Sequence, residues 1–299
     1  MKEQRTARLQ LILAMVIFGT VGIFVRYIPL PSSVIACARG FLGTAFLLLY
    51  MGIRRERMDR SAVRAHLVPL LLSGVAIGLN WVLLFESYRY TTVATATLCY
   101  YLSPTFVILA SPILIKERLP AKKLVCALVA LLGMVFVSGV IKGGLPTAGE
   151  GRGVLFGIGA AALYASVVLL NKKLGGLTAN DKTVMQLLAA AVTALPYVLL
   201  TEDVGAMSLS LTEGLLLLFV GIVHTGLAYT VYFGSLKTIP AQTAAIFSYI
   251  DPVVAILLSA LLLREKMDVF TAIGAVLILG SALASEVDFR KENGKFPGK

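Results

Sequence analysis

The sequence predicts an all-α integral membrane protein of ten transmembrane helices, arranged as two inverted five-helix repeats. Three observations support this fold class. The chain is strongly apolar, with 58% hydrophobic residues, 14% charged residues and a mean hydropathy of +0.87. Soluble domains carry about 25% charged residues, so this composition is typical of a membrane protein. The other two observations are a series of apolar runs long enough to cross a membrane and a second half that repeats the first.

The apolar runs define the predicted spans. A helix needs about 20 apolar residues to cross a hydrocarbon core about 30 Å thick. The connections hold about a dozen residues at most, so none has the size of a separate soluble domain. The runs also lack the alternating pattern of a membrane barrel. The predicted spans are residues 9–28, 33–53, 67–88, 93–115, 122–140, 153–171, 183–200, 214–236, 241–263 and 269–287.

The positive charges predict the orientation. If the N-terminus is cytoplasmic, the inner segments hold 20 Lys and Arg residues and the outer segments hold six. Cytoplasmic loops carry such an excess in membrane proteins. We therefore expect both termini, including the tail 288–299, to be cytoplasmic, and the protein to reside in the plasma (inner) membrane.

An internal repeat appears when the chain is shifted by 148 residues. The segments 78–117 and 226–265 share 13 identities in 40 positions without a gap. These identities include the pairs Tyr101/Tyr249, Pro104/Pro252 and Glu117/Glu265, which apolar composition alone would not align. The first unit is expected over residues 8–140 and the second over residues 151–287.

The number of spans in each unit determines their relative orientation. Each unit holds five predicted spans, and an odd number makes the second unit enter the membrane from the opposite side. Inverted repeats of this kind are common in secondary transporters, which bind their substrate near the bilayer midplane between the halves.

The chain resembles a known family at several motifs. These are the first-span motif Phe18-Gly19-Thr20, Arg39 in the second-span sequence CARGFL, and the proline followed by a helix-ending glutamate in both units. With the ten-helix plan, they resemble the EamA-type permeases of the drug/metabolite transporter superfamily. The resemblance implies a secondary transporter that exports a small metabolite by alternating access. The superfamily moves amino acids, other metabolites, amines and drugs, and an amino acid or a related amine is the first expectation.

Two ionisable residues lie near the centre of predicted spans, where they are costly and therefore candidates for function. Asp251 is about a dozen residues from either end of its span, and Pro252 after it permits a bend. Asp251 either carries a proton or balances a cationic group of the substrate; the alternative is a structural carboxylate that accepts from Ser and Tyr hydroxyls. His224 lies at a similar depth and either assists proton coupling or is a hydrogen-bonded structural residue.

A second pair of charges is predicted nearer the outer side. Arg39 lies in the second span and Glu86 near the outer end of the third. They either pair with each other, which lowers the cost of burying both, or act separately. In the second case Arg39 binds an anionic group of the substrate and Glu86 reaches the interface.

Aromatic and amide side chains supply further candidates for the wall of a binding site. Aromatic faces suit cationic or planar solutes, although some of these rings could instead form interfacial belts. The candidates are Asn80, Trp81, Tyr101, Gln186, Tyr229 and Tyr249.

Helix-end charges and glycines complete the structural expectations. Glu117 and Glu265 either close the two halves through salt bridges or are solvated at the interface. The spacings Gly74/Gly78 and Gly153/Gly157 predict close helix packing.

Other function classes receive little support from the sequence. It contains no zinc-protease motif, phosphate-binding loop, dinucleotide glycine loop or nucleophile elbow, so we expect no enzyme, no metal and no cofactor. We expect no nucleic acid and no obligate protein partner; the expected partners are a small-molecule substrate, the lipid bilayer and protons as a candidate coupling ion. The alternatives are an uncoupled exchanger or facilitator, a channel, a structural protein, or an intramembrane enzyme acting on a lipid-like substrate.

Overall fold

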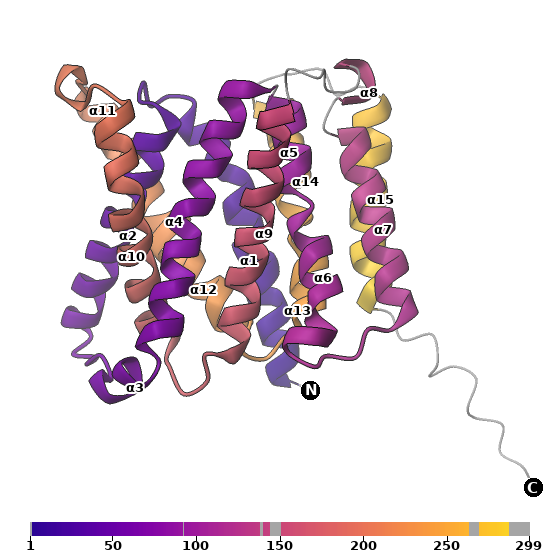
Figure 1. Cartoon of the computed structure of the whole chain (residues 1–299), viewed down its shortest axis with the longest axis horizontal. Helices are drawn as coiled ribbons and strands as arrows, with labels where there is room; N and C mark the ends of the chain where they lie inside the picture. Colours follow the sequence, from indigo (N-terminus) through magenta and orange to yellow (C-terminus); the bar gives the residue numbers. More distant parts are fainter. Residues whose placement is uncertain (1, 92, 138–139, 144–150, 263–268, 287–299) are drawn as a thin grey trace, which may run out of the picture.

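The computed structural model describes residues 2–91, 93–137, 140–143, 151–262 and 269–286, and these residues contain helices and no strand. The long helices stand side by side in one bundle (Figure 1). We call the end that holds the start of α1 and helix α3 the N-terminal face, and the other end the opposite face. The first half comprises α1 (Lys2–Val25), α2 (Ser32–Ile53), α3 (Arg60–Ala65), α4 (Leu67–Tyr90), α5 (Val93–Tyr100), α6 (Ser103–Leu114), α7 (Ala121–Val137) and α8 (Val140–Gly143).

The second half follows the same course from the opposite face. Eight helical segments of the described chain are long and apolar enough to cross a membrane, whereas α7 and α15 are apolar but only 17 and 18 residues long. The all-helical membrane fold is therefore confirmed, and the count of ten spans stays a prediction. The second half comprises α9 (Gly151–Lys173), α10 (Ala179–Thr201), η2 (Val204–Ala206), α11 (Leu211–Phe219), η3 (Val220–Leu227), α12 (Ala228–Ser235), α13 (Ala241–Phe247), α14 (Ile250–Leu262) and α15 (Val269–Glu286).

Three spans that the sequence predicted as continuous are interrupted. The span 93–115 divides into α5 and α6, and the span 241–263 divides into α13 and α14, at equivalent positions of the repeat. The cause is Pro104 in one and Pro252 in the other, since proline has no N–H to donate to the carbonyl four residues earlier. The interruption of the ninth predicted span lies beside Pro252, where the sequence permits a bend. The span 214–236 contains the π-helix η3, which separates α11 from α12.

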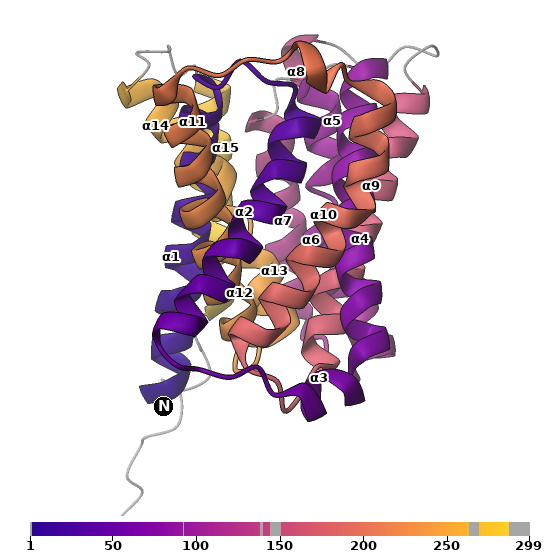
Figure 2. The ribbon, with the colours of Figure 1, turned by 90° about the vertical axis from the view of Figure 1, so that its left-hand side faces the viewer.

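Helices that are equivalent in the two units pack against each other. α2 contacts α10, α7 contacts α15, and α6 contacts α13, the neighbour of its own counterpart. Figure 1 shows α7 and α15 side by side at one edge of the bundle, and Figure 2 shows α2 beside α10. Such pairings across the two halves are the arrangement that a repeat related by an axis through the bundle would produce.

Glycines allow the closest approaches between helices. A Cβ atom added to Gly74 would lie 2.7 Å from the carbonyl oxygen of Gln186, and one on Gly78 would lie 2.6 Å from that of Ala190. Cβ atoms on Gly153 and Gly157 would meet Thr91 and Cys99 below 3 Å. The packing role predicted for these four glycines is confirmed: the first two bring α4 against α10, and the last two bring α9 against Thr91 and α5.

The surface of the bundle is apolar, as a lipid-facing surface requires. Ile113, Leu200, Leu261 and Val276 are each at least 71% exposed although they are large and hydrophobic. Polar side chains lie inside instead: Asn80, Gln186 and His224, for example, are at most 2% exposed. Because the polar side chains lie inside the bundle, a binding site for a polar solute is expected in its interior.

Candidate functional site

A central cavity of about 400 Å³ lies between the two halves of the bundle. Small-molecule sites commonly measure roughly 300–1,000 Å³, so the space suits a small solute. The cavity begins at mid-bundle and reaches the opposite face, where Val25 ends α1 and Ser32 begins α2. Its wall comprises Phe18, Val21, Gly22, Val25, Ser32, Ile35, Ala36, Arg39, Asn80, Trp81, Leu84, Phe85, Tyr88, Thr97, Tyr100, Tyr101, Tyr164, Tyr229 and Asp251.

Asp251 supplies the negative charge of the cavity wall. It lies in the first turn of α14, directly after the interruption of the ninth predicted span. Tyr101 Oη donates a hydrogen bond to Asp251 Oδ1 across 3.1 Å. On the backbone side α1 packs closely, because a Cβ atom on Gly19 would lie 2.6 Å from the Asp251 carbonyl oxygen. The carboxylate is thus anchored by one hydroxyl and held beside α1.

Arg39 supplies the positive charge of the same cavity. Its Nε donates to Thr225 Oγ1 across 3.1 Å, and that hydroxyl in turn donates to the Val220 carbonyl. Among the described residues, no carboxylate lies within ion-pairing distance of Arg39. The wall therefore carries one carboxylate and one guanidinium that do not neutralise each other by direct contact.

Aromatic rings form much of the remaining wall. Tyr101 stacks on Tyr249 with ring centroids 6.2 Å apart, and Tyr100 lies 5.9 Å from Tyr164. Tyr229 meets Phe18 edge to face at 5.2 Å. Aromatic faces attract cations and pack against planar groups, so this wall can hold an ammonium group or a flat side chain.

Asn80 and Tyr249 occupy the margin of the cavity. Asn80 lines the cavity, but its Nδ2 donates to the Ala160 carbonyl at 2.6 Å, which ties α4 to α9. Tyr249 lies behind Tyr101 and donates from its hydroxyl to the Tyr101 carbonyl at 3.0 Å. Tyr249 thus supports the wall rather than facing the space.

His224 lies beside the site, in the π-helix η3, and is not part of the wall. Thr20 Oγ1 lies 2.7 Å from His224 Nε2 and donates its own hydrogen to the Ile17 carbonyl. The hydrogen between them therefore belongs to Nε2, which leaves Nδ1 as an acceptor. Nδ1 is buried with no hydrogen-bond partner among the described residues, and Phe24 and Phe219 flank the ring. π-Helical turns occur frequently at functional sites.

Glu86 and Gln186 lie away from the cavity. Glu86 accepts hydrogen bonds from Arg89 at 3.0 Å and from Tyr197 at 2.6 Å. Of the two alternatives left open for Arg39 and Glu86, the structure therefore shows the one in which they do not pair with each other. Gln186 donates to Ser73 and Asn171 in a polar cluster between α4, α9 and α10. The sequence placed these two residues within predicted spans but did not indicate the helix face on which they lie.

Several cavity residues were absent from the sequence-based selection. Tyr88 and Thr97 are wall residues, and each follows or precedes a selected residue by whole helical turns: Tyr88 is seven residues after Trp81, and Thr97 four before Tyr101. Extending the face of each selected residue along its helix would have found them. Ser32 gives no such signal, because it begins its helix.

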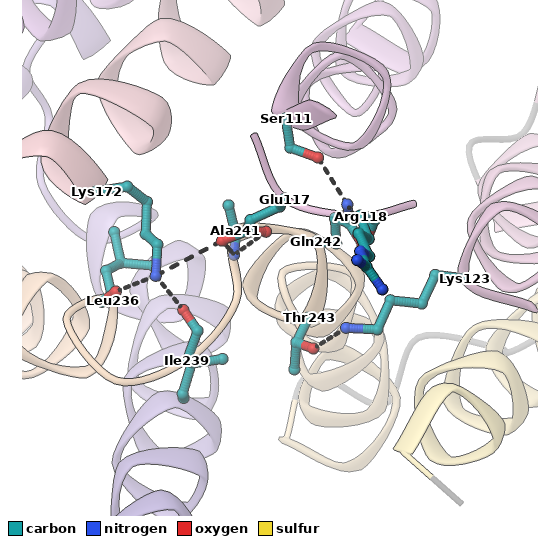
Figure 3. A network of polar contacts seen from close by, with 10 residues as sticks. All are labelled: Ser111, Glu117, Arg118, Lys123, Lys172, Leu236, Ile239, Ala241, Gln242 and Thr243. Atoms are coloured by element: carbon teal, nitrogen blue, oxygen red, sulfur yellow. Dashed lines mark hydrogen bonds and ion pairs between the residues drawn. The ribbon is translucent and has the colours of Figure 1, made fainter. Parts of the chain in front are cut away.

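A polar network joins the helix ends at the N-terminal face (Figure 3). Both carboxylate oxygens of Glu117 accept from the Ala241 backbone N–H at 3.1 Å, and Lys172 Nζ lies 3.7 Å from the same carboxylate. Lys172 also donates to the carbonyls of Leu236 and Ile239. We call the residues of this figure the closure network; they are Ser111, Glu117, Arg118, Lys123, Lys172, Leu236, Ile239, Ala241, Gln242 and Thr243.

The closure network connects the two halves. Gln242 donates to Ser111 at 2.8 Å and to the Arg118 carbonyl at 3.2 Å, and Lys123 donates to Thr243 at 2.6 Å. Two roles were left open for Glu117. In the structure its carboxylate contacts Ala241 and Lys172 of the second half, so it joins the two halves. Its repeat counterpart Glu265 and the tail 288–299 lie outside the described residues.

Comparison with known proteins identifies the same architecture elsewhere. The uncharacterized transporter YxxF of Bacillus subtilis strain 168 is 28% identical over 285 residues, covering 94% of this chain and 90% of the relative. Protein PecM of Dickeya dadantii is 28% identical over 216 residues, covering 71% of each chain. A solved crystal structure superimposes with a TM-score of 0.83 at 22% identity, covering 94% of this chain and 96% of the other.

The family comparison covers both halves of the chain. Residues 5–139 and residues 151–285 each match the EamA-like transporter family. A membrane transporter needs an apolar outer surface and an internal cavity for its solute, and this chain has both. This chain is a membrane protein of the EamA-like transporter family.

Proposed function

We propose that the protein is a secondary transporter that exports a small amine-bearing metabolite, with an amino acid as the first candidate, by alternating access. Its ten spans form two inverted units, residues 8–140 and 151–287, and the substrate binds in the central cavity between them. The single observation that carries this proposal is the wall of that cavity, which combines Asp251, Arg39 and a set of aromatic rings.

The chemistry of the wall favours a zwitterion. Asp251 can accept from an ammonium group, and Arg39 can donate two parallel hydrogen bonds to a carboxylate. The rings of Tyr100, Tyr101 and Tyr164 provide the surface against which an apolar or aromatic side chain packs. An α-amino acid carries these three features in one molecule.

The positions of the cavity and the closure network support an outward-facing state. With the N-terminus in the cytoplasm, as the excess of positive charge indicates, the cavity opens away from the cytoplasm. The closure network then seals the cytoplasmic side through Glu117, Lys172 and the start of α13. Alternating access requires this network to break when the opposite face closes.

Proton coupling is proposed to act through Asp251, with His224 as a helper. A proton and a substrate ammonium would compete for the same carboxylate, which links the two movements. His224 contacts Thr20, and Gly19 beside Thr20 packs on Asp251, so α1 joins the two residues. Uncoupled exchange remains the second candidate, and it predicts flux that ignores an imposed pH gradient.

The test is transport by purified protein in liposomes, with labelled amino acids and amines and an imposed pH gradient. Asp251→Asn should abolish proton-dependent flux, and its control is Glu86→Gln, which removes a carboxylate outside the cavity. Arg39→Gln should lower the apparent affinity for substrates that carry a carboxylate more than for amines that lack one. Its control is Arg89→Gln. If Asp251→Asn and the unaltered protein show the same pH dependence, proton coupling through Asp251 is refuted. If neither amino acids nor amines show saturable flux, the proposed substrate class is refuted.

A further inference from the structure

Thr225 is buried behind the charged wall of the central cavity. It lies in η3, is 0% exposed and does not line the cavity, so it has no surface to offer a substrate. Its hydroxyl accepts from Arg39 Nε at 3.1 Å and donates to the Val220 carbonyl at 3.3 Å. Because a hydroxyl has one hydrogen, and that hydrogen goes to the backbone, the Thr225 oxygen is left to accept from Arg39.

The contact with Thr225 occupies one edge of the Arg39 guanidinium. A guanidinium presents five N–H groups in a rigid planar fork. Nε donates to Thr225, whereas Nη1 and Nη2 donate to no residue in the part of the chain that the structure describes. Arg39 lines the cavity, so Nη1 and Nη2 are left to donate two parallel hydrogen bonds to a carboxylate in that space.

The π-helical turn and its glycines fix Thr225 against α2. The Thr225 hydroxyl reaches a carbonyl five residues earlier, which is the spacing of a π-helix, whereas in an α-helix it reaches three or four residues back. A Cβ atom on Gly221 would lie 2.5 Å from Leu42 Cβ. One on Gly226 would lie 2.8 Å from Phe46 Cδ1. η3 therefore approaches α2 closely both before and after Thr225, which holds donor and acceptor in place.

We propose that Thr225 is a positioning residue of the substrate site: it holds Arg39 with its Nη groups toward the cavity and so makes the site selective for solutes that carry a carboxylate. The proposal rests on the function proposed above, because it names how that site distinguishes an amino acid from the corresponding amine. Without the Thr225 hydroxyl, the Arg39 guanidinium can turn and present another edge. Carboxylate binding then has to order a side chain that the hydrogen bond otherwise holds in advance.

The experiment measures apparent affinities of the purified full chain from the rise in melting temperature with ligand concentration. The probes are three amino acids, each with its decarboxylated amine: leucine with isoamylamine, lysine with cadaverine and tyrosine with tyramine. Thr225→Val keeps the shape of the side chain but removes the hydroxyl. It should bind the amino acids about tenfold more weakly and the amines within about twofold of the unaltered chain. Thr225→Ser keeps the hydroxyl and should restore the preference for amino acids.

The matched control is Thr44→Val. Thr44 is buried on the same helix as Arg39, and its hydroxyl donates to the Gly40 carbonyl at 2.8 Å outside the cavity wall. Loss of that hydroxyl should leave the ratio of the amino-acid and amine affinities unchanged. The double variant Arg39→Gln/Thr225→Val should bind the amino acids no more weakly than Arg39→Gln alone, since Thr225 acts through Arg39.

The outcomes separate failure of the positioning role from failure of the proposed function. An equal loss for amino acids and amines in Thr225→Val, or an unaltered chain with no preference for the amino acids, overturns the positioning role alone. If the unaltered chain binds no probe, the proposed function fails and the positioning role falls with it.

A measurement on the unaltered chain decides the question if Thr225→Val does not fold. In NMR spectra of the chain with isotope-labelled arginine, the Arg39 resonances are assigned by their loss in Arg39→Gln. When an amino acid is added, the Nε resonance should shift less than the Nη resonances, because Nε stays bound to Thr225. A larger shift at Nε means that the carboxylate takes that edge, which overturns the proposal.

Discussion

The rings of Tyr101 and Tyr249 stack on each other with their centroids 6.2 Å apart, although 148 residues separate them in the chain. The two tyrosines are equivalent positions of the repeat, so the two units meet at this contact. Each also holds a polar partner: Tyr101 donates to Asp251, and Tyr249 donates to the Tyr101 carbonyl. The tyrosine pair therefore links the charge in the cavity to the junction of the two halves.

The first prediction concerns the hydroxyl of Tyr101. Tyr101→Phe keeps the stacked ring but removes the hydrogen bond to Asp251, and hydrogen bonds to charged groups contribute about 1.5–3 kcal/mol. We expect the apparent substrate affinity in liposomes to change roughly tenfold or more, with a changed pH dependence. The control is Tyr197→Phe, which removes a tyrosine hydroxyl from Glu86 outside the cavity. Equal transport by both variants would contradict a role for the Tyr101 hydroxyl.

The second prediction concerns the packing of α1 on α14. In Gly19→Ala the new methyl group would lie 2.6 Å from the Asp251 carbonyl oxygen and 2.7 Å from Val254 Cβ. Overpacking of this kind costs about 1–3 kcal/mol, so the melting temperature should fall. Gly22→Ala, one turn along the same helix, meets no atom within 4 Å and should melt as the unaltered protein does. If Gly19→Ala leaves stability and transport unchanged, α1 can shift away from α14 without loss of stability, and the close packing is not required.

The third prediction concerns the closure network. Lys172→Met removes two hydrogen bonds to carbonyls and the contact with Glu117, so the N-terminal face should open more often. A thiol-reactive reagent should then label a cysteine placed at Ser111 about tenfold faster from that face, as expected for a shift of about 1.4 kcal/mol. The labelling is measured after Cys37, Cys99 and Cys126 are replaced.

The control for that experiment is the neighbouring lysine. Lys173 is exposed on the same helix end, and Lys173→Met removes the same charge without touching the network. If both variants label at the same rate, the effect is due to surface charge and the closure network does not control access.

The fourth prediction concerns the contact between His224 and Thr20. Thr20→Val and His224→Leu each remove the hydrogen bond, so combining them should add little to either effect. A double-mutant cycle should give a coupling of about 0.5–1.5 kcal/mol in thermal stability. Strictly additive effects would mean that the 2.7 Å contact carries no energy of its own.

The sequence identified polar residues within spans better than the direction in which they face. Asp251 was selected as an ionisable residue near the centre of its span, Arg39 as a charge within a span and Trp81 as an aromatic ring, and all three line the cavity. Glu86 was selected as a charge near the outer end of its span and Gln186 for its amide group, but both contact neighbouring helices instead. Direction depends on how each helix rotates against its partners, and a helix that is apolar on all sides gives little sign of that rotation.

Interruptions of the helices were predictable only where a residue forces them. Pro252 indicated the division between α13 and α14, because it lacks the N–H that would donate to a carbonyl at the end of α13. Proline does not divide every helix, since Pro112 and Pro196 stand inside α6 and α10. Nothing comparable precedes η3, where the chain Val220–Leu227 takes a π-helical turn around His224. That turn packs against α2 and α1.

The position of Asp251 has a consequence for the energetics of the transport cycle proposed above. Its counterpart in the first unit is Ser103, which does not line the cavity, so in that proposal the two units present unequal chemistry to a substrate even though they are built alike. Exchange of the two conformations therefore need not interconvert states of equal energy, and the inward and outward rates can differ. Detailed balance nevertheless forbids such an asymmetry from accumulating a solute by itself. The carboxylate can set how fast the cycle turns in each direction, whereas net movement depends on the gradients that the membrane maintains.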